Sequence, residues 1–213
     1  MKTLKLTKKD FKKTDNYWMD YIGKEDISNY DGNVEIEGGL GYVKFNSINI
    51  KGYLLARAGT GIKAGCGITV GSSIEAGSSI KAGTSIEAGS GIKAGSSIKA
   101  GSSIKAGYSV KAGAGIEAGD GIEAGDGIEA GFGITCKKSL NIGLRIFAGL
   151  CLWRKPTKEE LEIKCGKLES GEVCYGDLIE TGIEEDDDKV EITCEGKTVK
   201  ISRESAIALN LTK

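Results

Sequence analysis

An aliphatic residue recurs at every sixth position from Ile62 to Ile146, and thirteen of these fifteen positions are isoleucine. The stretch repeats the pattern I-[KE]-A-G-x-[SG], as in residues 98–103, which read IKAGSS. A short fixed period means that every repeat must solve the same packing problem as its neighbours. The period therefore constrains the fold of this chain more than any other feature.

A six-residue period matches neither the turn of an α-helix nor a simple hairpin, but it matches one flat side of a triangular coil of about 18 residues. The isoleucine and the alanine two positions later share parity, so both face inward, and the lysine or glutamate between them faces outward. Each buried isoleucine contributes roughly 1.5–3 kcal/mol. The sequence predicts an all-β fold, a three-sided parallel β-helix (β-solenoid) whose coils stack Ile62, Ile80, Ile98, Ile116 and Ile134 on one side.

The glycine at the fourth position is expected at a corner, where it adopts backbone conformations barred to other residues. A disordered linker is excluded because low-complexity linkers lack an aliphatic residue in strict register. A collagen-like fold is excluded because the chain has one proline, Pro156, and no glycine at every third position. An ice-binding face is excluded because the threonines of the array are scattered.

Over about residues 50–152 the array resembles the hexapeptide-repeat superfamily of left-handed parallel β-helices, and residues 98–103 match the family repeat closely. The small fifth-position residue of that family is replaced here by Tyr108, Asp120, Asp126 and Phe132, while the recurrent small residue is the alanine at the third position. Because of this departure, a right-handed, bactofilin-like helix stays open as the second interpretation.

The chain as a whole also resembles uncharacterised β-helical proteins of bacterial phages and other mobile elements. This resemblance rests on the I-[KE]-A-G array and on residues 143–153, which read GLRIFAGLCLW. It implies no established activity. It does suggest a protein that binds and inhibits a host-defence protein, in the manner of an anti-CRISPR protein.

Three segments are expected: an N-terminal cap at 1–49, the β-helix at 50–152, and a small α+β capping or interaction module at 153–213. In the cap, residues 7–10 begin a short helix, and the turn at 31–32 precedes a strand at 34–36. The aromatic residues of this segment are interpreted as a cap core that lies on the first coil, rather than as a ligand-binding patch: Tyr17, Trp18, Tyr21, Tyr30 and Tyr42.

The C-terminal module contains mixed signals. Residues 157–160 form a capping box that starts a helix, although residues 161–163 could instead begin a strand. Residues 190–194 and 198–201 alternate like the two strands of a hairpin. Ser202 is expected to cap a terminal helix that runs to Leu211. The acidic run at 184–188 is expected to be a solvated loop.

Catalytic residues, metals and cofactors are not expected. The resemblance to the hexapeptide-repeat family implies acyltransferases and zinc-dependent carbonic anhydrases, which depend on histidine, and this chain has none. An acyltransferase-like enzyme is therefore the weakest of the functional hypotheses. Glu117, Glu123 and Glu129 fall on successive sides of the coil and form no acid/base pair.

The location is expected to be cytoplasmic, because no signal peptide or membrane span is recognisable. The six cysteines are then expected to be thiols. A metal site or a disulfide among Cys165, Cys174 and Cys194 is a minor alternative, since none is spaced as CxxC.

The array varies its outer charge, and this variation supplies the candidate binding residues. Lysines from 93 to 111 would form a basic belt around the rod, and acidic residues from 117 to 129 an adjacent acidic belt. The candidate partner-binding residues are Lys93, Lys99, Lys105, Lys111, Tyr108, Glu117, Asp120, Glu123, Asp126, Glu129 and Phe132. The alternative is that lysine and glutamate simply form ladders between coils.

A protein partner is the main expectation, because belts of opposite sign steer complementary partners. Homo-oligomerisation is possible through the apolar residues from Phe147 to Trp153, which are otherwise interpreted as the docking site of the C-terminal module. Nucleic acid is not expected, since lysines all round a rod give no groove and acids oppose phosphate. The sequence predicts a non-catalytic binding protein, with a structural or self-assembling fibre as the alternative.

Overall fold

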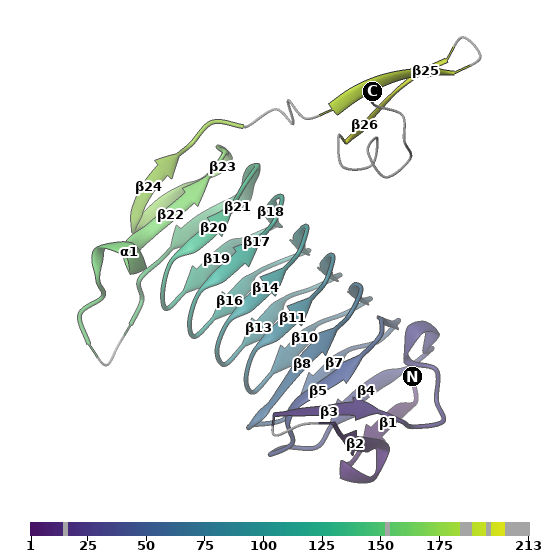
Figure 1. Cartoon of the computed structure of the whole chain (residues 1–213). Coiled ribbons are helices and arrows are strands. Elements are labelled where there is room, and N and C mark those ends of the chain that lie inside the picture. The colour runs from purple at the N-terminus through teal and green to yellow at the C-terminus, as the bar shows by residue number, and fades with distance from the viewer. Residues whose placement is uncertain (15–16, 152–153, 184–188, 195–196, 203–213) are drawn as a thin grey trace. The chain divides into compact units, whose positions relative to one another are not determined.

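The computed structural model describes residues 1–14, 17–151 and 154–183, and the backbone of residues 189–194 and 197–202. The chain divides into two compact units, Met1–Gly182 and Ile183–Lys213. The first unit is a stack of about eight coils (Figure 1). No helix in the described part of the chain combines the length and the apolar composition that crossing a membrane requires.

Each coil of the regular array contributes one short strand to each of three faces, and a strand pairs in parallel with the strand of the same face one coil further on. The first face contains β1 (Thr3–Leu6), β4 (Asn33–Ile36), β7 (Leu54–Ala56), β10 (Ile74–Ala76), β13 (Ile92–Ala94), β16 (Val110–Ala112) and β19 (Gly127–Ala130). The second face contains β6 (Ile48–Ile50), β9 (Ile68–Val70), β12 (Ile86–Ala88), β15 (Ile104–Ala106) and β18 (Ile122–Ala124).

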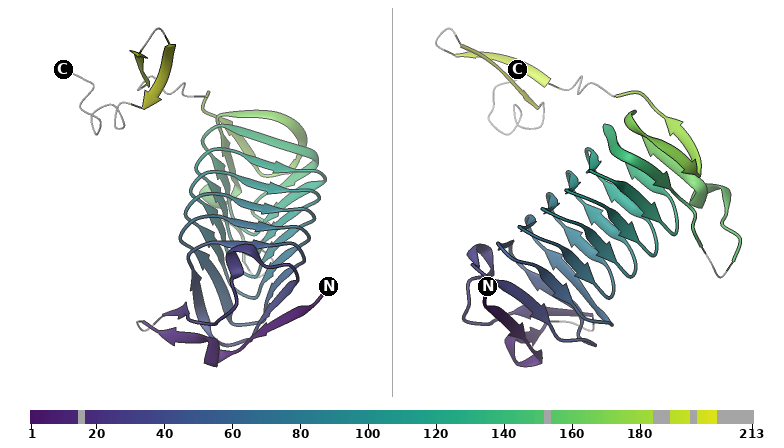
Figure 2. Two further views of the ribbon diagram at one scale, coloured as in Figure 1. Left: turned by 90° about the vertical axis from the view of Figure 1, so that its right-hand side faces the viewer. Right: turned by 180° about the vertical axis from the view of Figure 1, so that it is seen from behind.

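The third face is a sheet of its own. It contains β2 (Phe11–Lys13), β3 (Trp18–Tyr21), β5 (Gly41–Phe45), β8 (Thr60–Ala64), β11 (Ile80–Ala82), β14 (Ile98–Ala100), β17 (Ile116–Ala118), β20 (Ile134–Cys136), β22 (Glu162–Cys165) and β24 (Asp177–Glu180). All of its strands are parallel except β2, which is antiparallel to β3. Figure 2 shows the stack from two further sides.

The long strand β21 (Ser139–Phe147) turns the corner between two faces. Its first residues pair with β18 and its last residues pair with β19, so the first and second faces form one sheet. The strand β23 (Lys167–Tyr175) then pairs with β21. Strand stacking therefore extends from Thr3 to Glu180, beyond the limits of 50 and 152 that the regular repeat marks in the sequence.

The inward positions carry the isoleucine and the alanine of each hexad, as predicted. Ile80 and Ile98 are fully buried, Ala100 nearly so, and the lysine between Ile98 and Ala100 is exposed. The pairing register places isoleucine on isoleucine from residue 62 through 80, 98 and 116 to 134. The predicted three-sided parallel solenoid is confirmed.

The sequence predicted that the fourth-position glycines adopt backbone conformations barred to other residues, and this is wrong for the body of the array. Among the described fourth-position glycines of the array, a positive φ angle occurs only at Gly149, in the last hexad. Elsewhere glycine is required because the backbones of neighbouring coils approach each other closely at this position. A Cβ at Gly101 would overlap the carbonyl oxygen of Gly83 in the coil below, and a Cβ at Gly119 would overlap that of Gly101.

The N-terminal cap closes the first coil with aromatic packing. The predicted helical start is the 3-10 helix η1 (Lys8–Asp10), and the predicted strand is β4. A second 3-10 helix, η2 (Ile27–Asn29), follows β3. The ring of Phe11 lies 5.6 Å from that of Tyr21 and 5.8 Å from that of Phe45.

Only part of the aromatic set predicted as a cap core belongs to that core. Tyr21 lies in the cluster with Phe11 and Phe45, and Tyr30 packs partly buried against the core. Tyr17 is 75% exposed. Trp18 and Tyr42 form a separate ring pair with centroids 5.0 Å apart.

At the C-terminal side, both interpretations of the segment after residue 156 are confirmed. The helix α1 (Lys158–Leu161) begins with the predicted capping box, in which the backbone N–H of Thr157 donates to Glu160 Oε2 at 2.9 Å, and β22 follows directly. In the second unit, β25 (Lys189–Cys194) pairs antiparallel with β26 (Lys197–Ser202), as predicted. The predicted acidic loop at 184–188 and the predicted terminal helix through Leu211 lie outside the described residues.

Candidate binding surfaces

The lysines and glutamates predicted as two belts pair with each other across neighbouring coils. Each pair joins residues on adjacent strands of one face, and the three pairs lie on three different faces. The lysine Nζ atoms lie 2.6, 2.9 and 2.8 Å from the carboxylate oxygens in Lys99–Glu117, Lys105–Glu123 and Lys111–Glu129. Lys93 pairs with Glu75 in the opposite direction, at 3.1 Å.

These side chains are about half exposed, so solvent screens the ion pairs and each contributes little to stability. The hydrogen bond from Lys105 to Glu123 raises the pKa of that lysine. Eight of the charged residues in the array are thereby engaged within the solenoid. This arrangement is the ladder that the sequence offered as the alternative to free charge belts.

Two of the fifth-position candidates contact the chain's own later segments. Asp120 pairs with Lys138 Nζ at 2.9 Å. Phe132 is half-buried, and the Arg154 guanidinium lies 5.3 Å from its ring centroid. Glu160 binds Arg154 through both carboxylate oxygens, at 2.6 and 2.5 Å. The bonds from Arg154, together with the N–H of Thr157, lower the pKa of Glu160 to about 2.

The other two fifth-position candidates lie on one corner between the second and first faces. The backbone N–H of Asp126 donates to the carbonyl of Tyr108 at 2.8 Å, and the N–H of Leu144 donates to that of Asp126 at 2.6 Å. Tyr108 is 59% exposed and Leu144 is 61% exposed. We call the two exposed residues Tyr108 and Leu144 the apolar corner, and Asp126 lies between them.

A cavity of about 510 Å³ adjoins the apolar corner. Leu144, the half-buried Phe147 and the Lys111–Glu129 pair line it. Leu144 was not among the candidates from the sequence, although a signal for it exists. It follows Tyr108 by two coils, so stacking the sequence in rows of 18 places both residues in one column.

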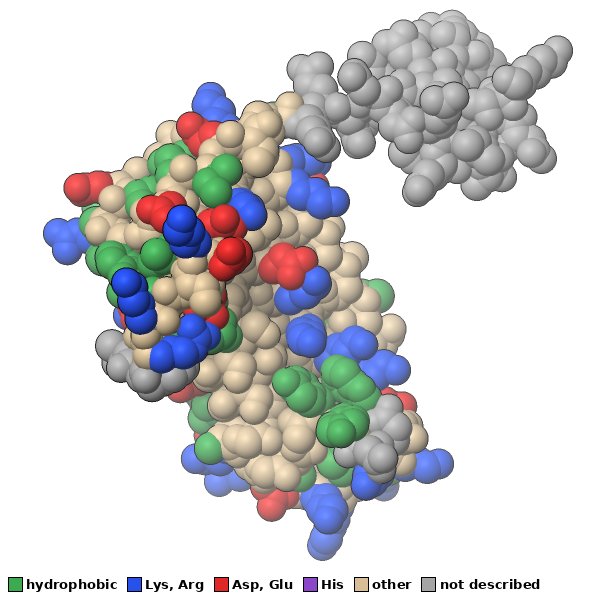
Figure 3. All heavy atoms as spheres, turned by 60° about the vertical axis from the view of Figure 1, so that its left-hand side comes forward, with side chains coloured by type: hydrophobic (Ala, Val, Ile, Leu, Met, Phe, Trp, Pro, Cys, Tyr) green, Lys and Arg blue, Asp and Glu red, His purple; other side chains and the backbone are tan. Residues whose placement is uncertain are grey.

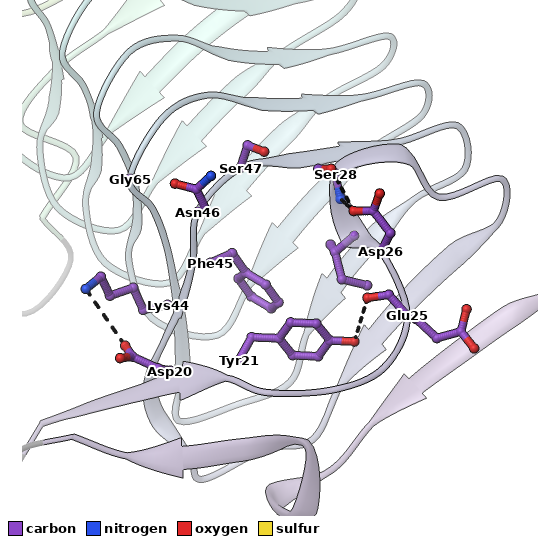
Figure 4. Close-up of a pocket in the computed structure, with 11 residues that line it drawn as sticks. Asp20, Tyr21, Glu25, Asp26, Ser28, Lys44, Phe45, Asn46, Ser47 and Gly65 are labelled. Carbon is purple, nitrogen blue, oxygen red and sulfur yellow. Dashed lines mark hydrogen bonds and ion pairs between the residues drawn. The ribbon is translucent and has the colours of Figure 1, made fainter.

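A second cavity, of about 530 Å³, lies in the N-terminal cap, and its lining includes three acidic residues, Asp20, Glu25 and Asp26 (Figure 4). Local contacts engage two of these three acids. Asp26 Oδ1 accepts from the backbone N–H of Ser28 at 2.9 Å, and the Lys44 ammonium lies 3.9 Å from Asp20 Oδ1. Among the described residues, no group of three or more histidine, cysteine or acidic side chains could hold a metal ion.

The described cysteines are free thiols: Cys66, Cys136, Cys151, Cys165 and Cys174. Burial raises the pKa of Cys136 to about 12 and also raises the pKa of Cys165. Both thiols face the apolar interior and pack as small hydrophobic residues. The side chain of Cys194, the third member of the predicted alternative metal set, lies outside the described residues.

No protein-family profile, no curated protein and no solved structure matches this chain. Strand pairing alone therefore defines the class of protein, a parallel β-solenoid with three faces and about eight coils. The likeness to hexapeptide-repeat proteins and to proteins of mobile elements stays a resemblance of sequence pattern.

Proposed function

We propose that this protein is a non-catalytic binding protein, whose solenoid holds the apolar corner rigidly for a protein partner. The observation that carries the proposal is the exposure of Tyr108 and Leu144 on one corner, beside a cavity lined by Phe147. Single exposed apolar side chains are common on protein surfaces, but clustered ones beside a cavity mark interaction sites.

The surroundings of the corner have the composition of a protein interface. Tyrosine anchors are enriched at interface hot spots, and charged groups form the rim. Here Asp126 lies between the two apolar residues, and Lys111, Glu129 and Arg145 border the cavity. Since Ser72 and Ser90 occupy the same corner in earlier coils, the scaffold does not itself require a large apolar residue there.

We further propose, from the resemblance to proteins of phages and other mobile elements, that the partner is a host-defence protein inhibited by binding. The test is affinity capture from host lysate with the full-length chain and the Tyr108→Ser/Leu144→Ser variant. Quantitative mass spectrometry should find a defence protein that the wild type enriches and the variant does not. With that partner purified, the variant should bind about 30-fold more weakly, as for the loss of a hot spot of about 2 kcal/mol.

A matched control is Tyr175→Ser/Leu178→Ser, which removes two exposed apolar side chains, 45% and 39% exposed, at the C-terminal end of the solenoid. It should capture the same partner as the wild type. Equal capture by all three proteins would contradict the role of the apolar corner.

Self-assembly is a second candidate, because β24 is the last strand of the third face among the described residues and presents an edge. If the chain self-assembles through this edge, light scattering should give a molar mass that grows with protein concentration. Tyr175→Ser/Leu178→Ser should then lower this molar mass, and Tyr108→Ser/Leu144→Ser should not.

A further inference from the structure

The third face carries a column of lysines that the other two faces do not have. Its outward positions align by register as Lys44 on Lys63, Lys63 on Lys81, and Lys81 on Lys99. The column ends in acids, with Asp20 below Lys44 and Glu117 above Lys99. Paired strands lie about 4.8 Å apart, so the four ammonium groups span about 14 Å.

The other faces show that the scaffold does not require this column. On the first face Glu75 pairs with Lys93, and Lys111 pairs with Glu129. On the second face Lys105 lies between Glu87 and Glu123. Like charges directly opposite each other destabilise a sheet. A run of four lysines on one face therefore opposes folding, and a binding role would account for it.

The two inner lysines have no acidic partner in the part of the chain that the structure describes. Lys44 lies 3.9 Å from Asp20, and Lys99 lies 2.6 Å from Glu117, whereas no described carboxylate forms an ion pair with Lys63 or Lys81. Their ammonium groups lie over aromatic rings instead, at 4.6 Å from the ring centroid of Trp18 for Lys63 and at 6.0 Å from that of Tyr42 for Lys81. These rings hold the ammonium groups in place without neutralising them.

An aromatic cavity of about 440 Å³ adjoins the lower end of the column. Tyr17, Trp18, Leu40 and Tyr42 line it, together with two further lysines, Lys8 and Lys13. Figure 3 shows Lys and Arg side chains gathered beside a hydrophobic patch on the solenoid. The surface thus combines a row of positive charge with one apolar recess at its end.

We propose that the third face binds an extended, acidic segment of a partner protein, with an apolar residue of that segment in the aromatic cavity. In an extended chain, side chains of one face repeat at about 6.6 Å, so three alternating acids span about 13 Å, which matches the lysine column. A single nucleic acid strand fits less well. It needs open ring faces for base stacking, and Lys63 and Lys81 cover those of Trp18 and Tyr42.

The test uses the full-length chain and a fluorescein-labelled peptide, Trp-Gly-Asp-Ser-Glu-Ser-Asp-Ser, in fluorescence anisotropy at low salt. Lys63→Gln/Lys81→Gln should weaken binding at least about tenfold, as for the loss of two charge-assisted contacts. The matched control is Lys93→Gln/Lys111→Gln, which removes the same charge from the first face and should change binding less than about twofold. Because Lys63 and Lys81 repel each other, their replacement should leave the midpoint of thermal unfolding unchanged or higher.

Three results would overturn the proposal. The first is absence of peptide binding to the wild type, or an equal loss in both variants. The second is tighter binding of a single-stranded oligothymidine of ten nucleotides than of the peptide, which would identify a nucleic acid surface. The third is self-association of the wild type that is abolished both by salt and by Lys63→Gln/Lys81→Gln. This result would show that the third face binds a second copy of this chain. The third face and the apolar corner are separate surfaces, so either proposal can fail alone.

Discussion

At the scale of single residues, stacking fixes some positions of the hexad and leaves others free. The isoleucine, the alanine and the glycine meet their counterparts in the coils above and below, so packing limits which residues these positions accept. The second and fifth positions face solvent and carry the variation. The candidate binding residues Tyr108, Leu144, Lys63 and Lys81 all lie at these free positions.

Substitution of a fourth-position glycine tests the close approach of the coils. In Gly101→Ala the new Cβ overlaps the carbonyl oxygen of Gly83, which is backbone and cannot rotate away. We expect a loss of unfolding free energy on the order of 3 kcal/mol, measured by chemical denaturation. The control is Gly115→Ala at the sixth position, where a Cβ would lie 3.3 Å from the carbonyl oxygen of Gly133 and where serine occurs in other hexads.

The control should cost less than about 1 kcal/mol. A similar small loss in both variants would show that the coils move apart easily, and would contradict a tight stacking of the corners.

The inward and outward positions of the hexad could be predicted from the sequence, whereas the pairing of its charges was only one of three interpretations. Read along the chain, Lys93 to Lys111 looks like a belt. When the sequence is written in rows of 18 residues, the lysines fall into columns. In one column Lys99 is adjacent to Glu117 on one side and to Lys81 on the other. Rows of 18 residues therefore reveal the lysine column from Lys63 to Lys99, whereas Lys44 lies 19 residues before Lys63 and joins the column only through the strand register of the structure.

At the scale of elements, the coil is the interchangeable unit. Each coil of the array adds one strand to every face, and its contacts are with the coil on either side. The stability of such a stack is close to a sum of coil terms and interface terms. Removal of one whole coil should therefore leave the remaining interfaces intact.

Deletion of residues 80–97 tests this expectation. It would place Ile98 on Ile62 and Lys111 opposite Glu75, so every inward and outward position keeps its role. We expect an unchanged far-ultraviolet circular dichroism per residue and a fall in the unfolding midpoint of about 5 °C, because the shorter stack keeps its packing.

Deletion of residues 80–88 is the matched control, because it removes half a coil and displaces Ile92 by three positions. Aliphatic residues then face outward, and cooperative unfolding should disappear. A cooperative transition in this control, or its absence in the deletion of the whole coil, would contradict the role of the period.

The elements outside the regular array were harder to predict. β22, β23 and β24 continue the faces, but the segment that contains them lacks the hexad spacing, and the register of β23 against β21 shifts at several points. Such irregular strands are specified by contacts with the coil beneath them, which the local sequence does not reveal. The capping box at Thr157 could be predicted because it depends on neighbouring residues only.

At the scale of the whole molecule, the first unit is nearly one-dimensional. Its two ends close differently, with an aromatic cluster around Phe11 at the N-terminal end and the strands β22 to β24 at the other. In a linear stack the inner coils are protected by neighbours on both sides, and opening spreads from the ends. The stability of each end should therefore be a local property.

Hydrogen exchange of the variant Phe11→Ala tests whether the ends are independent. Phe11 is buried against Tyr21 and Phe45, and its truncation costs about 3–5 kcal/mol in a packed site. Amides of β3, β5 and β8 should exchange on the order of 100-fold faster, while those of β20 and β22 should keep their rates. Ile163→Ala, in β22, is the mirror-image control and should speed exchange only at the C-terminal end. Faster exchange along the whole stack in either variant would show one cooperative unit, in which a partner at any face would stabilise every coil.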